Sequence, residues 1–164
     1  MLLPADKTRR RKFPPLEAVA FGEKKMGLVY ADIELISADD LALNRRGFLP
    51  EDQIKRMTVS ALVDSGSYML TVNEHIKEQL DLPVLGEEIA RLADESEVRV
   101  TVVGPVDVRF GNRATTVRAL MFSGNAEPLL GAIPMEDMDV IVDPKQQQLI
   151  VNPENPYIAR KSVK

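Results

Sequence analysis

The chain has 164 residues, of which 45% are hydrophobic and 5% aromatic, and it has neither cysteine nor tryptophan. This length suits one domain with an aliphatic core, and the missing cysteines exclude disulfides, thiolate metal sites and cysteine nucleophiles. Residues 1–25 carry seven Lys or Arg against three Asp or Glu, so a basic segment of +4 precedes an acidic remainder of −8. An acidic body argues against nucleic-acid binding.

The two ends of the chain differ from its middle. A basic tract at 8–12, flanked by prolines, predicts that residues 1–25 form a disordered tail. Residues 26–152 form the predicted domain, and the proline-containing segment 153–164 is expected to be a C-terminal arm or tail. No run of about 20 apolar residues predicts a membrane span, and no apolar N-terminal run predicts a signal peptide. We therefore expect a cytoplasmic protein.

The middle of the chain is predicted to be mostly β. Alternating apolar residues and turn signals predict strands at 27–36, 55–63, 68–72, 88–93, 97–103, 105–110, 114–122, 139–143 and 148–152. Turns are expected at Asp94-Glu95-Ser96, Gly104-Pro105 and Gly111-Asn112. Residues 37–53 read as a long loop, or as a short helical turn capped by Ser37 or Asp39. Short helices are predicted after the N-cap Asn73 and at 134–138, so the fold class is all-β with one or two short helices, in a barrel or sandwich.

One stretch of the sequence contains side chains that could take part in a reaction. The residues Ala61-Leu62-Val63-Asp64-Ser65-Gly66-Ser67 deliver a carboxylate, a hydroxyl and a glycine directly after an apolar strand. We expect Asp64 at the strand's end, facing a packed interior, where a carboxylate must be hydrogen-bonded or used. Taken alone, the tripeptide favours a buried structural acid. A serine-hydrolase interpretation fails because the sole histidine, His75, lies downstream on a predicted surface helix.

Three segments together resemble the retropepsin-like aspartic proteases, particularly their small single-domain prokaryotic members. The first is residues 62–67, which match the family's Asp-Thr/Ser-Gly-Ala/Ser motif. The second is Leu129-Leu130-Gly131, two apolar residues and a glycine before a short helix. The third is the strand and turn at 138–144. The resemblance covers about residues 26–152 and implies a closed β-barrel with one lobe per chain.

The resemblance also implies the roles of the motif residues. Because the chain has one motif, two copies would form a homodimer, and each would supply Asp64 as catalytic acid-base towards a polypeptide substrate. Ser65 would brace the two loops across the dimer, Gly66 would permit their close approach, and Ser67 would hydrogen-bond the carboxylate. Behind the active-site loop the family places a rigid support, which here is Leu129, Leu130 and Gly131. Water is the nucleophile in this family, so neither a cofactor nor a metal is implied.

A predicted hairpin supplies both the substrate flap and an alternative function. The resemblance assigns the flap to the turn formed by Asp94, Glu95 and Ser96. The family's flap tip usually holds a glycine, which this turn lacks, and Ile133 stands where small members often have Asp. These differences favour a second hypothesis, in which the same dimeric fold is catalytically inactive and acts as a peptide-binding or scaffolding module.

Overall fold

The computed structural model describes residues 27–163, so the tail that we predict at 1–25 lies outside the described residues. The strands are β1 (Tyr30–Ser37), β2 (Arg56–Val63), β3 (Leu70–Asn73), β4 (Val84–Arg91), β5 (Glu97–Phe110), β6 (Arg113–Phe122), β7 (Leu129–Leu130), β8 (Val140–Asp143) and β9 (Gln148–Val151). The helices are α2 (Ala38–Arg45), the 3₁₀ turn η1 (Glu51–Gln53), α3 (Glu74–Leu80) and α4 (Ala132–Met138).

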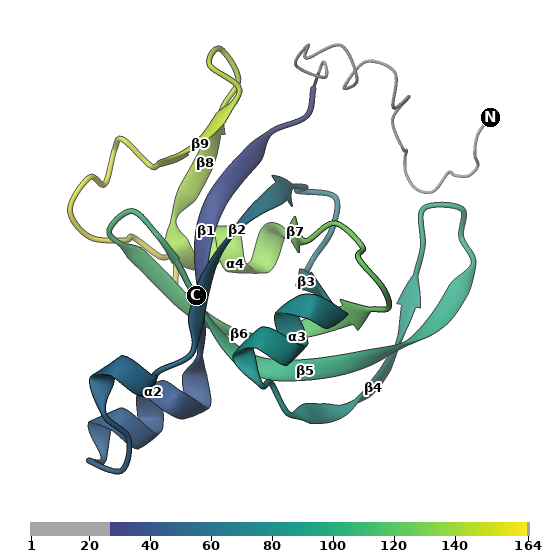
Figure 1. The fold of residues 1–164 in the computed structure, drawn as a ribbon. Coiled ribbons are helices and arrows are strands. Elements are labelled where there is room, and N and C mark those ends of the chain that lie inside the picture. The colour runs from purple at the N-terminus through teal and green to yellow at the C-terminus, as the bar shows by residue number, and fades with distance from the viewer. Residues whose placement is uncertain (1–26, 164) are drawn as a thin grey trace, which may run out of the picture. The chain divides into compact units, whose positions relative to one another are not determined.

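The main sheet closes on itself. Its strand order is β1-β2-β7-β3-β6-β5-β4, and an additional antiparallel pairing of β1 with β5 joins the two sides of the sheet. The ring therefore runs through β1, β2, β7, β3, β6 and β5, while β4 pairs with β5 in a hairpin (Figure 1). Closure satisfies the backbone groups that an open edge would leave unpaired. The predicted all-β closed barrel with short helices is confirmed.

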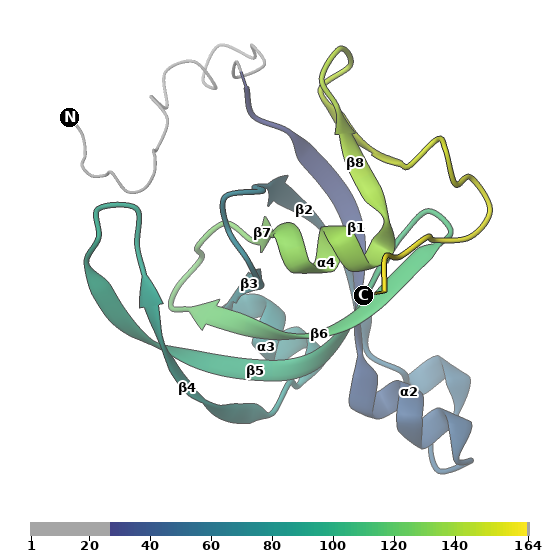
Figure 2. The ribbon, with the colours of Figure 1, turned by 180° about the vertical axis from the view of Figure 1, so that it is seen from behind.

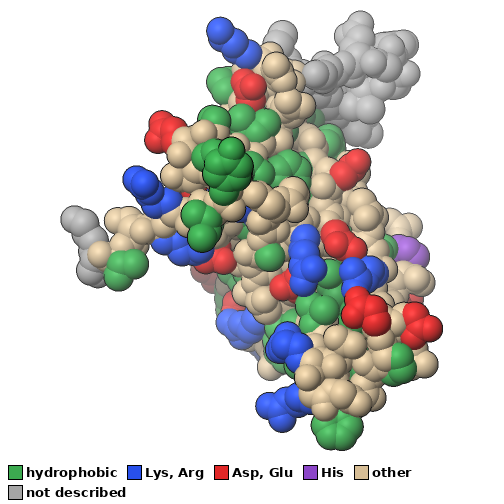
Figure 3. Space-filling model, turned by 90° about the vertical axis from the view of Figure 1, so that its left-hand side faces the viewer, with side chains coloured by type: hydrophobic (Ala, Val, Ile, Leu, Met, Phe, Trp, Pro, Cys, Tyr) green, Lys and Arg blue, Asp and Glu red, His purple; other side chains and the backbone are tan. Residues whose placement is uncertain are grey.

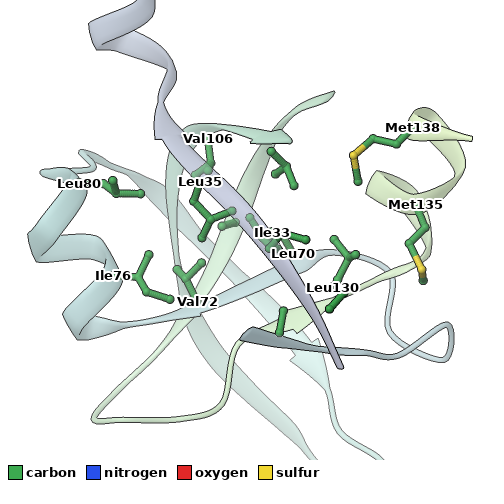
Figure 4. Packing of buried hydrophobic residues seen from close by; sticks show 14 of the residues in the cluster. Ile33, Leu35, Leu70, Val72, Ile76, Leu80, Val106, Leu130, Met135 and Met138 are labelled. Carbon is green, nitrogen blue, oxygen red and sulfur yellow. The ribbon is translucent and has the colours of Figure 1, made fainter. Parts of the chain in front are cut away.

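Strand alternation explains where the core lies. In β1 the side chains of Ala31, Ile33 and Leu35 are buried, whereas the alternate residues Tyr30 and Asp32 are exposed and Glu34 is half-buried. The two helices after β3 and β7 add apolar residues to the same cluster. Figure 4 shows this cluster of buried residues, which includes Leu70, Val72, Ile76, Leu80, Leu130, Met135 and Met138. The predicted Asn73 cap is confirmed, since its Oδ1 accepts the N–H of Ile76 at 2.9 Å.

One local prediction is wrong, and one open alternative is decided. No turn forms at Gly104-Pro105, because β5 continues from Glu97 to Phe110 and its register with β6 shifts between Val103 and Val106. The glycine sits in this β-bulge at φ +133, a backbone conformation that favours glycine. In the segment 37–53 the helical alternative is confirmed over the long loop. Helix α2 begins there, and the Ser37 hydroxyl accepts the Asp40 N–H at 3.2 Å, as the helical alternative expected.

The hairpin of β4 and β5 forms a compact unit. Contacts divide the described chain into this unit, residues 27–28 with 87–100, and a second unit of 29–86 with 101–163. The hairpin turn closes where predicted, because the N–H of Leu92 donates to the carbonyl of Ser96 at 2.8 Å. Glu95 occupies the turn at φ +72. An ion pair of 3.1 Å between Arg99 and Glu87 joins the two strands.

Charge is mixed on the face drawn in Figure 3, where Lys and Arg side chains lie beside Asp and Glu side chains. That face therefore presents no extended field of one sign. Within residues 27–163, no helix has the length and apolar character required to cross a bilayer.

Asp139 anchors the segment that we predict as the C-terminal arm. Its carboxylate accepts hydrogen bonds from the side chains of Asn152 at 3.0 Å and Asn155 at 2.8 Å, and from the backbone N–H of Arg160 at 3.0 Å. The buried guanidinium of Arg113 lies 3.8 Å away and donates to the Asn155 carbonyl. The Arg160 N–H, followed by the Asn152 amide, lowers the pKa of Asp139 below its ordinary value.

We predict that Asp139→Asn removes a pH-dependent part of the stability. A lowered folded-state pKa contributes stability that is present above the unfolded-state value of about 3.9 and is lost as pH falls through the folded-state pKa. The urea midpoint of the wild type should therefore exceed that of the variant at pH 7, and the gap should narrow below about pH 4. Asparagine tolerates the left-handed backbone at this position, which has φ +56.

Glu154→Gln serves as the control, since this exposed acid lies in the same segment. Its urea midpoint should follow that of the wild type at every pH. A gap between Asp139→Asn and wild type that stays constant down to pH 2 would contradict the assignment.

Candidate active site

Asp64 stands directly after β2, as predicted. Its backbone N–H donates to the carbonyl of Leu130 at 3.0 Å, and its carboxylate Oδ1 accepts the N–H of Gly66 at 3.0 Å. The Asp64 carbonyl accepts the N–H of Ser67 at 3.1 Å, which closes the turn. The expectation of a packed interior is wrong. Asp64 is only half-buried, because strand alternation places it on the face opposite to the buried Ala61.

A short strand joins the loop to its predicted support. β7 pairs in parallel with β2, where Leu62 lies opposite Leu129, and antiparallel with β3, where Thr71 lies opposite Leu129. The N–H of Leu62 donates to the carbonyl of Pro128 at 2.9 Å. The two sequence segments that we singled out are therefore adjacent in the fold, and β7 fixes both strands that flank the Asp64 turn.

Gly131 is required for space rather than for its backbone angles, since its φ is −94. A Cβ atom there would lie 2.4 Å from the carbonyl oxygen of Met69 and 2.7 Å from that of Ser67. The next two residues bind the same turn, because the N–H groups of Ala132 and Ile133 donate to the carbonyls of Ser67 and Tyr68 at 2.8 and 2.9 Å. Helix α4 begins at this contact and leads into β8 (Figure 2).

Several predicted roles remain predictions. The exposed Ser65 and Gly66 are placed at the tip of the turn, where a second copy would have to approach. The Asp64 carboxylate accepts the Gly66 N–H. A hydrogen bond from the Ser67 hydroxyl to the same carboxylate stays a prediction. The hairpin turn at Asp94-Glu95-Ser96 forms, but its closure over a substrate stays a prediction.

Sequence reasoning missed a pair of polar residues beside the motif. The hydroxyl of Tyr30, on β1, donates to Oε1 of Glu127 at 3.0 Å. Tyr30 lies opposite Leu62 in the β1–β2 register, two residues before Asp64. Burial, with a smaller effect of the Glu127 carboxylate, raises the pKa of Tyr30 to about 12. Only the pairing register of the strands shows that these two residues are neighbours, and the sequence alone does not give that register.

The described site offers acid-base chemistry. A half-exposed carboxylate that accepts a backbone N–H is positioned to take or give a proton. Residues 27–163 contain no group of three or more His, Cys, Asp or Glu side chains arranged to hold a metal ion.

Comparisons with known proteins identify the fold. No family model and no curated protein matches the sequence. The retroviral protease-like domain of Ddi1 from Leishmania major matches with a TM-score of 0.50 and 14% identity, over 79% of this chain and 91% of that domain. The chain has the retropepsin-like fold. A retropepsin-like aspartic protease from Rickettsia conorii is also similar, with a TM-score of 0.45 and 11% identity over 73% of this chain and 79% of that one.

We predict that Gly131→Ala lowers the free energy of unfolding by about 3 kcal/mol, because the new methyl group would overlap backbone atoms that cannot rotate away. Chemical denaturation measures this loss. Gly66→Ala is the matched control, since its Cβ would meet only a side-chain oxygen, Asp64 Oδ1, at 3.3 Å. The control should cost less than about 1 kcal/mol. Equal losses in the two variants would refute the close approach at Gly131.

Proposed function

We propose that the chain is an aspartic-type endopeptidase that acts as a homodimer, with one Asp64 from each copy. The observation that carries this proposal is the position of Asp64 on a retropepsin-like fold. Asp64 directly follows the last residue of β2, and its partly exposed carboxylate accepts the Gly66 N–H. Its backbone N–H donates to the Leu130 carbonyl. This arrangement supports a proton-transfer role better than a structural one, because a structural carboxylate would be expected to have more side-chain partners.

The chemistry requires a second copy. One carboxylate cannot act as base towards water and also protonate the substrate in the same step. Two carboxylates about 3 Å apart repel by roughly 5–6 kcal/mol at an effective dielectric constant of about 20, which is about four pK units. The pair must therefore share one proton at neutral pH, as is well established for aspartic proteases in general.

The shared proton defines the reaction steps. The ionised Asp64 takes a proton from a water molecule, and the water oxygen bonds to the carbonyl carbon of the scissile peptide. The protonated Asp64 of the partner subunit donates its proton to the carbonyl oxygen, which gives a tetrahedral diol. The carbon–nitrogen bond then breaks as the first Asp64 gives its newly acquired proton to the amine nitrogen. The ionised Asp64 of the partner subunit takes a proton from a hydroxyl of the diol, which leaves a carboxylic acid product and both acids in their starting state.

One observation favours a second candidate, a peptide-binding module without catalysis. The turn of the β4–β5 hairpin contains no glycine, and Glu95 adopts a left-handed φ of +72 there. A non-glycine residue in this conformation costs roughly 1–2 kcal/mol. Such a turn would be less adaptable than a glycine tip when a peptide is bound and released.

We predict that Asp64→Asn abolishes cleavage of a peptide library across pH 3–7, by at least about a hundredfold, because the base is lost. The fold should persist, since the asparagine oxygen still accepts the Gly66 N–H. Asp52→Asn, an exposed acid in η1, is the control and should cleave like the wild type. Cleavage by Asp64→Asn at the wild-type rate would refute the proposal, and binding without cleavage by the wild type would favour the module.

We also predict that the Asp64→Asn chain lowers the cleavage activity of the wild type by forming mixed dimers with it. When equal amounts of both chains exchange partners, about half of the wild-type chains pair with an inactive copy, so activity should fall to about half. A tenfold excess of the variant should leave about a tenth of the activity. Activity that stays constant as the variant is added would show that each chain works alone.

A further inference from the structure

A polar bridge crosses the strand that leads to Asp64. β2 lies between β1 and β7 in the sheet, and Leu62 on β2 faces Tyr30 on one side and Leu129 on the other. The Tyr30 hydroxyl nevertheless reaches the Glu127 carboxylate, at 3.0 Å. Glu127 lies two residues before Leu129. The tyrosine side chain must therefore extend across β2 at the level of Leu62.

This bridge shares a face with Asp64. Ala31 and Ala61 point into the barrel core, so the alternate residues Tyr30 and Leu62 point away from it. The ladder continues to Asp64, whose N–H bonds to the Leu130 carbonyl, so Asp64 lies on the same face as Leu62. Two residues along a strand span about 6.6 Å. That spacing is about the distance between the scissile bond and a neighbouring side chain in an extended peptide.

The charge of this face is negative. Glu127 is exposed and has no ion-pair partner among residues 27–163, although Tyr30 holds one of its oxygens. Asp32 is the next outward residue of β1, opposite Ser60, and it is likewise exposed and unpaired within the described part of the chain. The Tyr30 phenol is protonated at physiological pH and donates its hydrogen bond as a neutral group. An anionic carboxylate held beside an aromatic ring and Leu62 suits a cation on an apolar stem.

We infer that Glu127, oriented by Tyr30, binds a Lys or Arg side chain of the substrate next to the scissile bond. The inference rests on the proposed function and names its substrate class. The aliphatic stem of the basic residue would lie on Leu62 and the tyrosine ring, and its charged end would bind the free Oε2 of Glu127. Glu127 is thus the binding group, and Tyr30 is a positioning residue.

The test uses peptides of one apolar sequence in which each position in turn is either Lys or its uncharged isostere norleucine. Binding to the Asp64→Asn chain is measured by fluorescence anisotropy, and cleavage by the wild type is measured in parallel. We expect Lys at one position to bind about tenfold more tightly than norleucine, as for a partly exposed charge-assisted hydrogen bond. When Glu127→Gln is combined with Asp64→Asn, the ratio of Lys-peptide to norleucine-peptide affinity should fall to within about twofold, while the affinity for the norleucine peptide stays unchanged.

Two further variants, each also combined with Asp64→Asn, locate the effect. Tyr30→Phe keeps the ring and loses the hydrogen bond, so the Lys-to-norleucine ratio should fall about threefold without a change in the thermal midpoint. A merely structural role for Tyr30 would move the midpoint and leave the ratio intact. Glu136→Gln, an exposed acid on α4, is the charge-matched control and should preserve the ratio.

The outcomes separate this inference from the proposed function. A Glu127-dependent preference for Lys in binding, without cleavage by the wild type, supports the basic-substrate inference and refutes only the protease. Cleavage with no Lys preference, or with a preference that survives Glu127→Gln, overturns the inference and leaves the protease standing. Neither binding nor cleavage of any peptide overturns both.

Discussion

The hydrogen bond from the Asp64 N–H to the Leu130 carbonyl is the contact on which the arrangement of the site depends. β7 is only two residues long, yet it pairs with β2 on one side and β3 on the other. The turn that carries Asp64 starts at the end of β2 and finishes at the start of β3. One short strand therefore holds both ends of that turn, and Gly131 lets the following helix begin against the turn's own backbone.

Much of the fold follows from local signals in the sequence. Alternating apolar residues are sufficient to place β1 and β6, and the Asn73 side chain marks the beginning of α3. The Gly104-Pro105 pair shows where such signals fail. Turns and β-bulges require the same residue types, so only the pairing with β6 reveals that the strand continues. The sequence alone does not decide between the capped helix α2 and a loop, because the apolar pattern of this segment is weak.

The residues of the candidate site also divide into those that the sequence predicts and those that only the structure shows. The residues contiguous in sequence, from Asp64 to Ser67, were found because their order alone is informative. Their support at Leu129 to Gly131 required a resemblance to a known family. Tyr30 and Glu127 stand 97 positions apart and share no motif, so nothing short of the strand register places them together. The outward position of Asp64 does not follow from the sequence, because the apolar run at the end of β2 does not show which of its faces is the outer one.

The late position of β7 in the chain has a consequence for biosynthesis. A ribosome must add 67 residues after Leu62 to reach its parallel neighbour Leu129. Until that second segment emerges, the loop after β2 lacks its scaffold, and bringing such distant segments together is slow. We therefore expect a nascent or truncated chain that stops before Leu129 to lack an ordered Asp64 turn, because β7 would not be there to pair with the strands on either side of that turn.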